Sequence, residues 1–375
     1  MSNRIELDAP DIGTIEKEQV CAAIDSGFVS SFGPWVGEFE RQFAQLVGVP
    51  RAVAIQSGTA ALHMALHVLG IKAGDEVILP STTFAATLHA VMYVKATPVI
   101  VDVDRDTWCL SVDAFKAAIT SKTKAVIPVH LYGNACDMEA ITSIAAAKGI
   151  FVVEDATESL GALMSGRHLG TWGDMGCYSF NGNKLMTTGS GGMMVARSTD
   201  ILERVGYLIN QTNPREGMEG YQEVGFNYRM PNLNAALGIA QLSRFKGFIG
   251  LKKTFHQIYE TQLEKSGLCL MQKTYPGAEP SWWFTAVLLK NAAEVLHVQK
   301  YLKNSGIPSR GIFKPLHTLG YAKVFQKGSC DNAQMLYERG LCLPSSTLNT
   351  EEMINSVCGA IKQALKLSEA KKEIN

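Results

Sequence analysis

Residues 76–103 read EVILPSTTFAATLHAVMYVKATPVIVDV and hold the pattern that decides the fold. Two apolar runs, at 76–79 and 97–103, flank a segment at 84–93 that has helical character. A continuous apolar run indicates a strand buried on both faces, and a helix between two such strands is typical of a right-handed parallel crossover. The stretch therefore predicts two parallel strands of one sheet with a helix packed over them.

The same alternation of apolar runs and helical segments continues on both sides of this stretch. The further strands expected are 52–56, 125–131, 150–154, 177–180 and 192–196, and the further helices include 35–47, 59–69, 113–119 and 138–148. In such a sheet the carboxyl ends of the strands meet at one edge, where ligands bind. The sequence thus predicts an α/β fold with a mainly parallel sheet and a site just after Gln56, Leu79, Leu131 and Glu154.

The length of 375 residues allows two domains. A long helical pattern begins at 232, and the regular alternation ends near residue 267. The later elements are one strand-like run and three helices, at 283–289, 293–305, 332–339 and 351–366. We therefore expect a large domain over residues 1–250 and a smaller α+β domain over residues 251–375.

The composition excludes several classes of protein. The 35 Lys and Arg residues balance 35 Asp and Glu residues, so the basic excess of a nucleic-acid binder or of a polybasic membrane surface is missing. Zero net charge favours association, which agrees with an oligomer. The eight cysteines include no C-x-x-C pair, so we expect buried thiols and no metal site. The start, MSNRIELDAP, has no apolar signal segment, and charged residues interrupt the most apolar stretch, so we expect a cytoplasmic protein without a membrane span.

Two polar motifs follow predicted strands. Residues 57–60 (SGTA) open a helix, where free backbone N–H groups and the positive end of the helix dipole suit a phosphate. Asp155 ends an apolar run and can bind a metal, hold a ribose or protonate a ring nitrogen, and Glu158 can face the same space. Each motif also has an ordinary structural interpretation, as a helix N-cap or a turn.

Lys184 lies in SFNGNKLMTTGSGG (residues 179–192), between two predicted strands. A lysine after a strand is usually solvated, but the neighbours of Lys184 are hydroxyls, amides and glycines rather than other charges. A partly desolvated lysine with a lowered pKa is the group needed to form a Schiff base. An anion site at a helix terminus, an aspartate at a strand end and this lysine are together the parts required to hold pyridoxal phosphate.

Five ordered blocks of the sequence carry a family resemblance. They are SGTAALHMAL, PSTTFAAT, VEDATESLGA, YSFNGNKLMTTGSGGMM and GFNYRMPNLNAALGIAQL. With these blocks the chain resembles, from about residue 28 to the 340s, the sugar-nucleotide aminotransferases of the DegT/DnrJ/EryC1/StrS family. The resemblance implies the fold-type I aspartate aminotransferase fold and pyridoxal phosphate as cofactor.

The resemblance also implies roles for particular residues. Lys184 would carry the cofactor as a Schiff base and move protons, Asp155 would pair with the pyridine nitrogen, and Phe84 would stack on the ring. The remaining cofactor contacts would be Gly58, Thr59, Ala60 and Ser179 at the phosphate, Glu158 near the phenolic oxygen, and Asn227 from a neighbouring subunit. Asn227 therefore implies a homodimer with a shared active site. Arg229 and His317 fall where the family has residues near the substrate, although His317 can equally be an ordinary loop histidine.

Two positions depart from the family pattern. Many members have Gln or His at the position of Glu158, and Glu at the position of Ser190. A carboxylate beside an anionic phenolate is repelled unless one of the two is protonated, so we expect Glu158 to titrate abnormally. DATESLG together with SFNGNK resembles the branch that makes 4-amino-4,6-dideoxy-N-acetylhexoses for legionaminic acid or bacillosamine.

The resulting expectation is an aminotransferase that moves an amino group from L-glutamate to the C4 ketone of a nucleotide-linked 4-keto-6-deoxyhexose, with a UDP-linked 2-acetamido sugar as the expected form. An inosose aminotransferase shares most motifs and stays open as an alternative. A sugar dehydratase of the same scaffold has His where this chain has Lys184, and a PLP-binding regulator would need a DNA-binding segment. Candidate nucleotide contacts are Arg215, Trp283, Arg310 and Lys314, for which surface ion pairs and packing are the ordinary alternatives.

Overall fold

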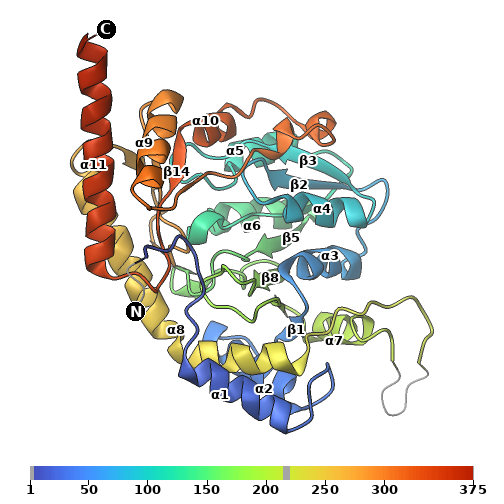
Figure 1. The fold of residues 1–375 in the computed structure, drawn as a ribbon. Coiled ribbons are helices and arrows are strands. Elements are labelled where there is room, and N and C mark those ends of the chain that lie inside the picture. Colours follow the sequence, from blue (N-terminus) through green and yellow to red (C-terminus); the bar gives the residue numbers. More distant parts are fainter. Residues whose placement is uncertain (1–3, 214–219, 375) are drawn as a thin grey trace.

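A seven-stranded sheet forms the centre of the computed structural model, which describes residues 4–213 and 220–374 (Figure 1). From one edge to the other its strands are β1 (Val53–Ile55), β9 (Gly192–Ala196), β8 (Met175–Ser179), β5 (Phe151–Asp155), β4 (Thr123–Val126), β2 (Glu76–Pro80) and β3 (Thr97–Val101). The five strands from β8 to β3 pair in parallel, and β9 runs antiparallel to both of its neighbours. The predicted α/β architecture with a mainly parallel mixed sheet is confirmed.

Helices cover both faces of this sheet because its strands are apolar on both faces. In β2, Val77 and Leu79 enter one hydrophobic core and Ile78 enters the other, as the alternation of side chains along a strand requires. One face is covered by α3 (Gly58–Val68), α4 (Ala85–Tyr93) and α7 (Thr199–Leu208). The other is covered by α2 (Pro34–Val47), α5 (Val112–Ala118), α6 (Met138–Lys148) and α8 (Asn232–Tyr259), with α1 (Thr14–Asp25) packed against α8.

The segment that carries Lys184 is a long hairpin between β8 and β9. Ser179 pairs with Gly192, so residues 180–191 leave the sheet and return to it at the same edge. At the base of the hairpin the N–H of Phe180 donates to the carbonyl of Gly191 over 2.9 Å. This is the edge at which β5 ends in Asp155, so the antiparallel strand brings the lysine and the aspartate together.

The C-terminal part of the chain is built around a second, antiparallel sheet. Its strands, in order, are β10 (Leu270–Met271), β12 (Ala286–Leu288), β14 (Gly340–Cys342) and β13 (Arg310–Gly311). Its helices are α9 (Ala292–Asn304), α10 (Asp331–Arg339) and α11 (Glu351–Ile374), and the long α8 runs into this part of the fold (Figure 1). The proposed domain boundary at residue 250 lies inside α8.

The remaining elements are short. A three-stranded sheet consists of β11 (Ala278–Glu279), β6 (Leu163–Met164) and β7 (Arg167–His168). Single helical turns are η1 (Leu131–Gly133), η2 (Glu260–Glu264), η3 (Leu316–Thr318) and η4 (Lys323–Phe325). Within the two described ranges no helix has the length and apolar character needed to cross a membrane. The same ranges contain no cluster of His, Cys, Asp and Glu side chains that could hold a metal ion.

The strand predicted at 283–289 is shorter than expected, because β12 begins only at Ala286. Trp282 has a φ of 49°, in the left-handed region, which is incompatible with a continuous strand. The N–H of Ser281 donates to the carbonyl of Gly133 over 3.0 Å, so this segment is bound to the loop after β4 instead of to a neighbouring strand. As a result Trp283 leaves the sheet and lines the cavity described next.

Candidate active site

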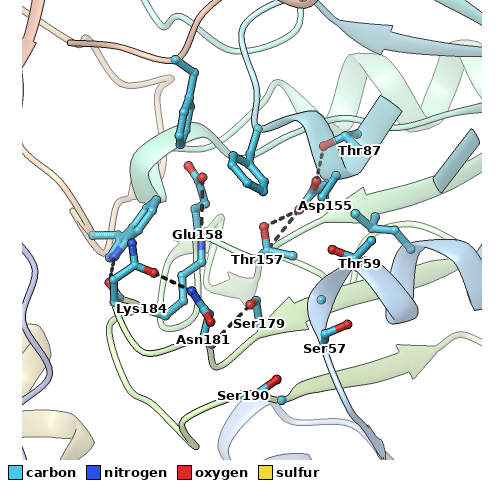
Figure 2. A pocket seen from close by; sticks show the side chains of 18 of the residues that line it. Ser57, Thr59, Thr87, Asp155, Thr157, Glu158, Ser179, Asn181, Lys184 and Ser190 are labelled. Atoms are coloured by element: carbon cyan, nitrogen blue, oxygen red, sulfur yellow. Dashed lines mark hydrogen bonds and ion pairs between the residues drawn. The ribbon is translucent and has the colours of Figure 1, made fainter. Parts of the chain in front are cut away.

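A cavity of about 300 Å³ lies at the carboxyl edge of the large sheet (Figure 2). Most of the residues predicted for the site line it, namely Gly58, Thr59, Phe84, Asp155, Glu158, Ser179 and Lys184. Ala60 is not among the lining residues, and its N–H donates to the Ser57 hydroxyl over 3.1 Å. The structure therefore brings together residues from four separate segments of the sequence.

The first turn of α3 forms an anion cradle at one end of the cavity. Ser57 caps the helix, and the first backbone N–H groups of a helix have no carbonyl partner within the helix, which suits an anion. A Cβ on Gly58 would lie 2.8 Å from the Cβ of Ser179 and 2.9 Å from the Cγ2 of Thr157, so only glycine permits this close approach. The hydroxyls of Ser57, Thr59 and Ser179 surround the same point (Figure 2).

Asp155 is the last residue of β5, and two threonines hold its carboxylate in place (Figure 2). Thr87 donates to Oδ2 over 2.7 Å, and Thr157 donates to Oδ1 through its hydroxyl over 2.7 Å and its N–H over 3.2 Å. A carboxylate that accepts three such bonds is fixed in orientation. Neither threonine was a predicted site residue. The spacing of Asp155 and Thr157 was a usable signal, because Asp side chains often bond to the backbone two residues on.

Lys184 and Glu158 form a buried pair at the other end of the cavity. Nζ of Lys184 lies 3.7 Å from Oε1 of Glu158, and the two side chains are 14% and 3% exposed. Burial lowers the pKa of Lys184 below its usual value, although Glu158 and Asp155 oppose this. Burial likewise raises the pKa of Glu158, although Lys184 and the N–H of Tyr132, 2.9 Å from Oε2, oppose it. The predicted abnormal titration of Glu158 agrees with this environment.

The substitution Glu158→Gln should change how stability depends on pH. Because the pKa of Glu158 is raised in the folded protein, the wild type loses stability as the pH rises from the usual range of a glutamate through this higher pKa, whereas the variant does not. We expect the unfolding temperature of the cofactor-free variant, relative to wild type, to increase by about 2 °C between about pH 5 and about pH 8. Differential scanning calorimetry measures the difference.

Glu38→Gln is the matched control for this prediction. Its carboxyl is exposed, and hydrogen bonds from Arg41 lower its pKa to about 2, so it stays ionised across the whole range. Its variant should therefore differ from wild type by the same amount at every pH. A pH-independent difference for Glu158→Gln as well would contradict the raised pKa.

A tryptophan and an arginine, Trp283 and Arg310, also line the cavity. From the sequence, packing was the favoured role for the first and a surface ion pair for the second. Trp283 places its ring against Lys184, and Arg310 is surrounded by the rings of Trp283, Phe284 and Phe313. The Cζ atom of Arg310 lies 4.4 Å from the centre of the Phe284 ring. Both residues come from the C-terminal part of the chain, so no local pattern could place them beside Lys184. Lys314 does not line this cavity, and Arg215 lies outside the described residues.

Besides Ala60, three predicted site residues lie outside this cavity. Asn227 and Arg229 line a neighbouring cavity of about 680 Å³, which shares Ser57 and Ser190 with the first. His317 lines neither cavity, and its Nδ1 lies 2.7 Å from the hydroxyl of Ser81. Partial burial lowers the pKa of His317, which favours the neutral ring. The roles of these residues at a substrate or in a partner subunit stay predictions.

The residues of the first cavity fit pyridoxal phosphate. The cradle at Gly58 suits a phosphate, the fixed carboxylate of Asp155 suits a protonated ring nitrogen, and the amine of Lys184 suits an aldehyde. Phe84 is 60% exposed although it is a large apolar side chain, so one face of its ring is free to cover the cofactor ring. The cavity of a single chain therefore holds a group suited to the phosphate, to the ring nitrogen and to the aldehyde.

Comparisons with known proteins agree with this fit. A model of the DegT/DnrJ/EryC1/StrS aminotransferase family matches residues 10–362. The GDP-perosamine synthase of Escherichia coli O157:H7 is 37% identical over 360 residues, which cover 96% of this chain and 98% of that protein. The structure of the aminotransferase TlmJ from Streptoalloteichus hindustanus matches with a TM-score of 0.92 and 27% identity, over 97% of this chain and 100% of that one. The PLP form of Spr1654 from Streptococcus pneumoniae gives 0.90 and 26%, over 96% and 98%.

Proposed function

The chain belongs to the DegT/DnrJ/EryC1/StrS aminotransferase family, and we propose that it transfers the amino group of L-glutamate to the C4 ketone of a nucleotide-linked 4-keto-6-deoxyhexose. As a member it is a PLP-dependent sugar aminotransferase. The observation that carries the proposal is the position of the Lys184 amine, in one small cavity with the carboxylate of Asp155 and the cradle at Gly58.

The residues divide the chemistry among them. Pyridoxal phosphate, when bound, supplies an electron sink that stabilises negative charge on the carbon next to the amino group. Asp155 would keep the ring nitrogen protonated, held in position by Thr87 and Thr157. Lys184 would bond to the aldehyde and, once released, would take up and return the proton at the donor α-carbon. Its lowered pKa provides a larger fraction of the neutral amine, which both steps need.

Two observations favour different nucleotides. The blocks DATESLG and SFNGNK resemble the legionaminic acid and bacillosamine branch, which favours a UDP-linked 2-acetamido sugar and a product of the UDP-N-acetylbacillosamine type. The relative from Escherichia coli is named for a GDP-linked sugar and is similar over almost the whole chain. Similarity over the full length includes every segment that could contact a nucleotide, whereas the two blocks surround the cofactor. We therefore rank the GDP-linked keto sugar first and the UDP-linked 2-acetamido sugar second.

A substrate panel tests the proposal. The holoenzyme is incubated with L-glutamate and with GDP-, UDP- or dTDP-linked 4-keto-6-deoxyhexoses, and mass spectrometry detects the amino sugar and 2-oxoglutarate. We expect one nucleotide to exceed the others in kcat/KM by at least about tenfold, because a buried polar contact that one base satisfies is left unpaired by another. Turnover of an inosose in the absence of turnover of every keto sugar nucleotide would contradict the proposal.

We also propose that two copies of the chain share each active site. Asn227 does not line the cofactor cavity of its own chain, yet it lies in an adjoining cavity that opens on the same phosphate-end residues, Ser57 and Ser190. Arg229 has an Nε atom that is buried and, among the described residues, without a hydrogen-bond partner. These two observations support a site that a second copy completes.

A further inference from the structure

The amine of Lys184 rests against the face of an indole ring. Its Nζ lies 3.7 Å from the centre of the Trp283 ring and 3.7 Å from Oε1 of Glu158. The negative face of an aromatic ring attracts an ammonium group, most strongly where water is excluded, and here the Trp283 side chain is only 2% exposed. The ring and the carboxylate therefore form a seat for the charged amine.

Trp283 is fixed at both its side chain and its backbone. The indole Nε1 donates to the carbonyl of Asn183, the residue before the lysine, over 2.7 Å. The carbonyl of Trp283 accepts from the Nζ of Lys252 over 2.8 Å, and the same Nζ donates to the carbonyl of Ser345. Lys252 is 4% exposed and has no acidic partner within salt-bridge distance in the described chain. Burying a lysine is costly, and the only hydrogen bonds described for this one go to two backbone carbonyls. We therefore infer that Lys252 serves to fix the position of these carbonyls.

We propose that Trp283 is a positioning residue that holds the Lys184 amine whenever this amine is not bonded to the cofactor, and that Lys252 acts on Lys184 only through Trp283. The proposal rests on the function given above, in which Lys184 alternates between a bonded and a free state. In the free state a flexible lysine would sample many rotamers, and the seat holds the amine, once it has taken up the proton, in the region from which it must return that proton.

Besides the Trp283 ring, several charged groups act on the Lys184 amine. Glu158 and Asp155 favour its protonated form, whereas Arg310 and burial oppose it. The indole face adds to the first group. Burial lowers the pKa of Lys252 to about 7, and both the charged and the neutral amine have enough N–H groups for two carbonyls, so its two hydrogen bonds can form on either side of this pKa.

The substitution Trp283→Leu distinguishes two roles of the ring, attraction of the Lys184 ammonium group and mere exclusion of water from it. If the ring attracts the ammonium, its loss makes Lys184 a weaker base, by about tenfold. If the ring only excludes water, its loss relieves burial and makes Lys184 a stronger base. The measurement is the pH profile of Lys184 acetylation in cofactor-free protein, followed by peptide mass spectrometry. Trp283→Phe keeps a smaller ring and should give an intermediate result.

Lys252→Met tests the second half of the proposal, and Lys253→Met is its matched control. Lys253 is the next residue on α8, with a side chain 43% exposed, so its replacement should leave the Lys184 profile unchanged. Lys252→Met should weaken Lys184 as a base, and should add nothing in the background of Trp283→Leu. Loss of a nearby positive charge alone would have the opposite sign, because it would strengthen the base.

Each outcome decides the proposal separately from the proposed function. An unchanged or stronger Lys184 base in Trp283→Leu overturns the seat, and additive effects of the two substitutions overturn the route through Trp283. Thermal unfolding of every variant identifies one that has lost its fold, and Trp283→Phe then carries the test. The pH profile of Lys184 is recorded without cofactor or substrate. The proposal for Trp283 can therefore be overturned while the aminotransferase assignment holds, and the assignment can be overturned while the proposal for Trp283 holds.

Discussion

Lys184→Ala should lower the rate of amino transfer by about four orders of magnitude or more, because one side chain supplies both the covalent bond to the cofactor and the proton transfer at the α-carbon. The substitution removes the only amine among the described residues that line the cavity. The measurement is the glutamate-dependent release of 2-oxoglutarate. Borohydride treatment, which should fix the cofactor to the wild-type Lys184 peptide, should leave the variant without added mass.

Lys253→Ala is the control for this prediction, since it removes a lysine from the surface of α8 and should keep both signals. The variant at 184 should remain folded, because its side chain makes one ion pair with Glu158 and no hydrogen bond that another element needs. Turnover within tenfold of wild type, or borohydride-fixed cofactor on another peptide, would show that a different group performs the chemistry.

Asp155→Asn has the second largest expected effect, a fall in kcat of about three orders of magnitude. The amide has nearly the size of the carboxylate and still accepts one hydrogen bond, but it carries no charge to hold a proton on the ring nitrogen. Thr87 and Thr157, which donate to the carboxylate in the native protein, would face an amide that satisfies only part of this set. Steady-state kinetics with glutamate and the keto sugar nucleotide measures the effect.

Two further variants show whether Asp155 acts through the charge of its carboxylate or through its hydrogen bonds. Thr87→Val keeps the carboxylate and removes one of its donors, so it should cost about tenfold, the range of one hydrogen bond to a charged group. Asp106→Asn replaces an aspartate on the surface that is paired with Lys273 and should have no effect. If Asp155→Asn were no worse than Thr87→Val, the charge of Asp155 would not be the reason for its position.

The core of the site could be predicted because local patterns determine it. The apolar run that ends at Asp155 indicated that this residue lies at the carboxyl edge of the sheet, and Ser57 and Gly58 at the start of α3 indicated the anion cradle. Trp283 could not be predicted, because its segment reads as a strand until the left-handed backbone of Trp282 and the contact with Gly133 are known. The site contacts of Arg310 likewise depend on segments that are far apart in sequence.

Residues whose role depends on a second molecule show the other limit. Family resemblance placed Asn227 and Arg229 at the active site, whereas the single chain places them in the adjoining cavity. Helix α7 is a different case, because Leu202, Val205 and Leu208 have helical spacing and Ser198 stands at the N-cap, so its own segment carries the signals of a helix. A role in a second chain is information that short-range periodicity does not contain, whereas α7 could be predicted from its own residues.

The single reversed strand of the large sheet has a consequence for how this enzyme can be altered. A connection between parallel strands must cross the sheet, so a change in its length moves a covering helix. The connection at 180–191 returns to the edge it left, with Phe180 bonded to Gly191 at its base. A change in the length of this loop can therefore be absorbed within the loop, while β8 and β9 keep their register and the covering helices stay in place, as long as Lys184 keeps its position.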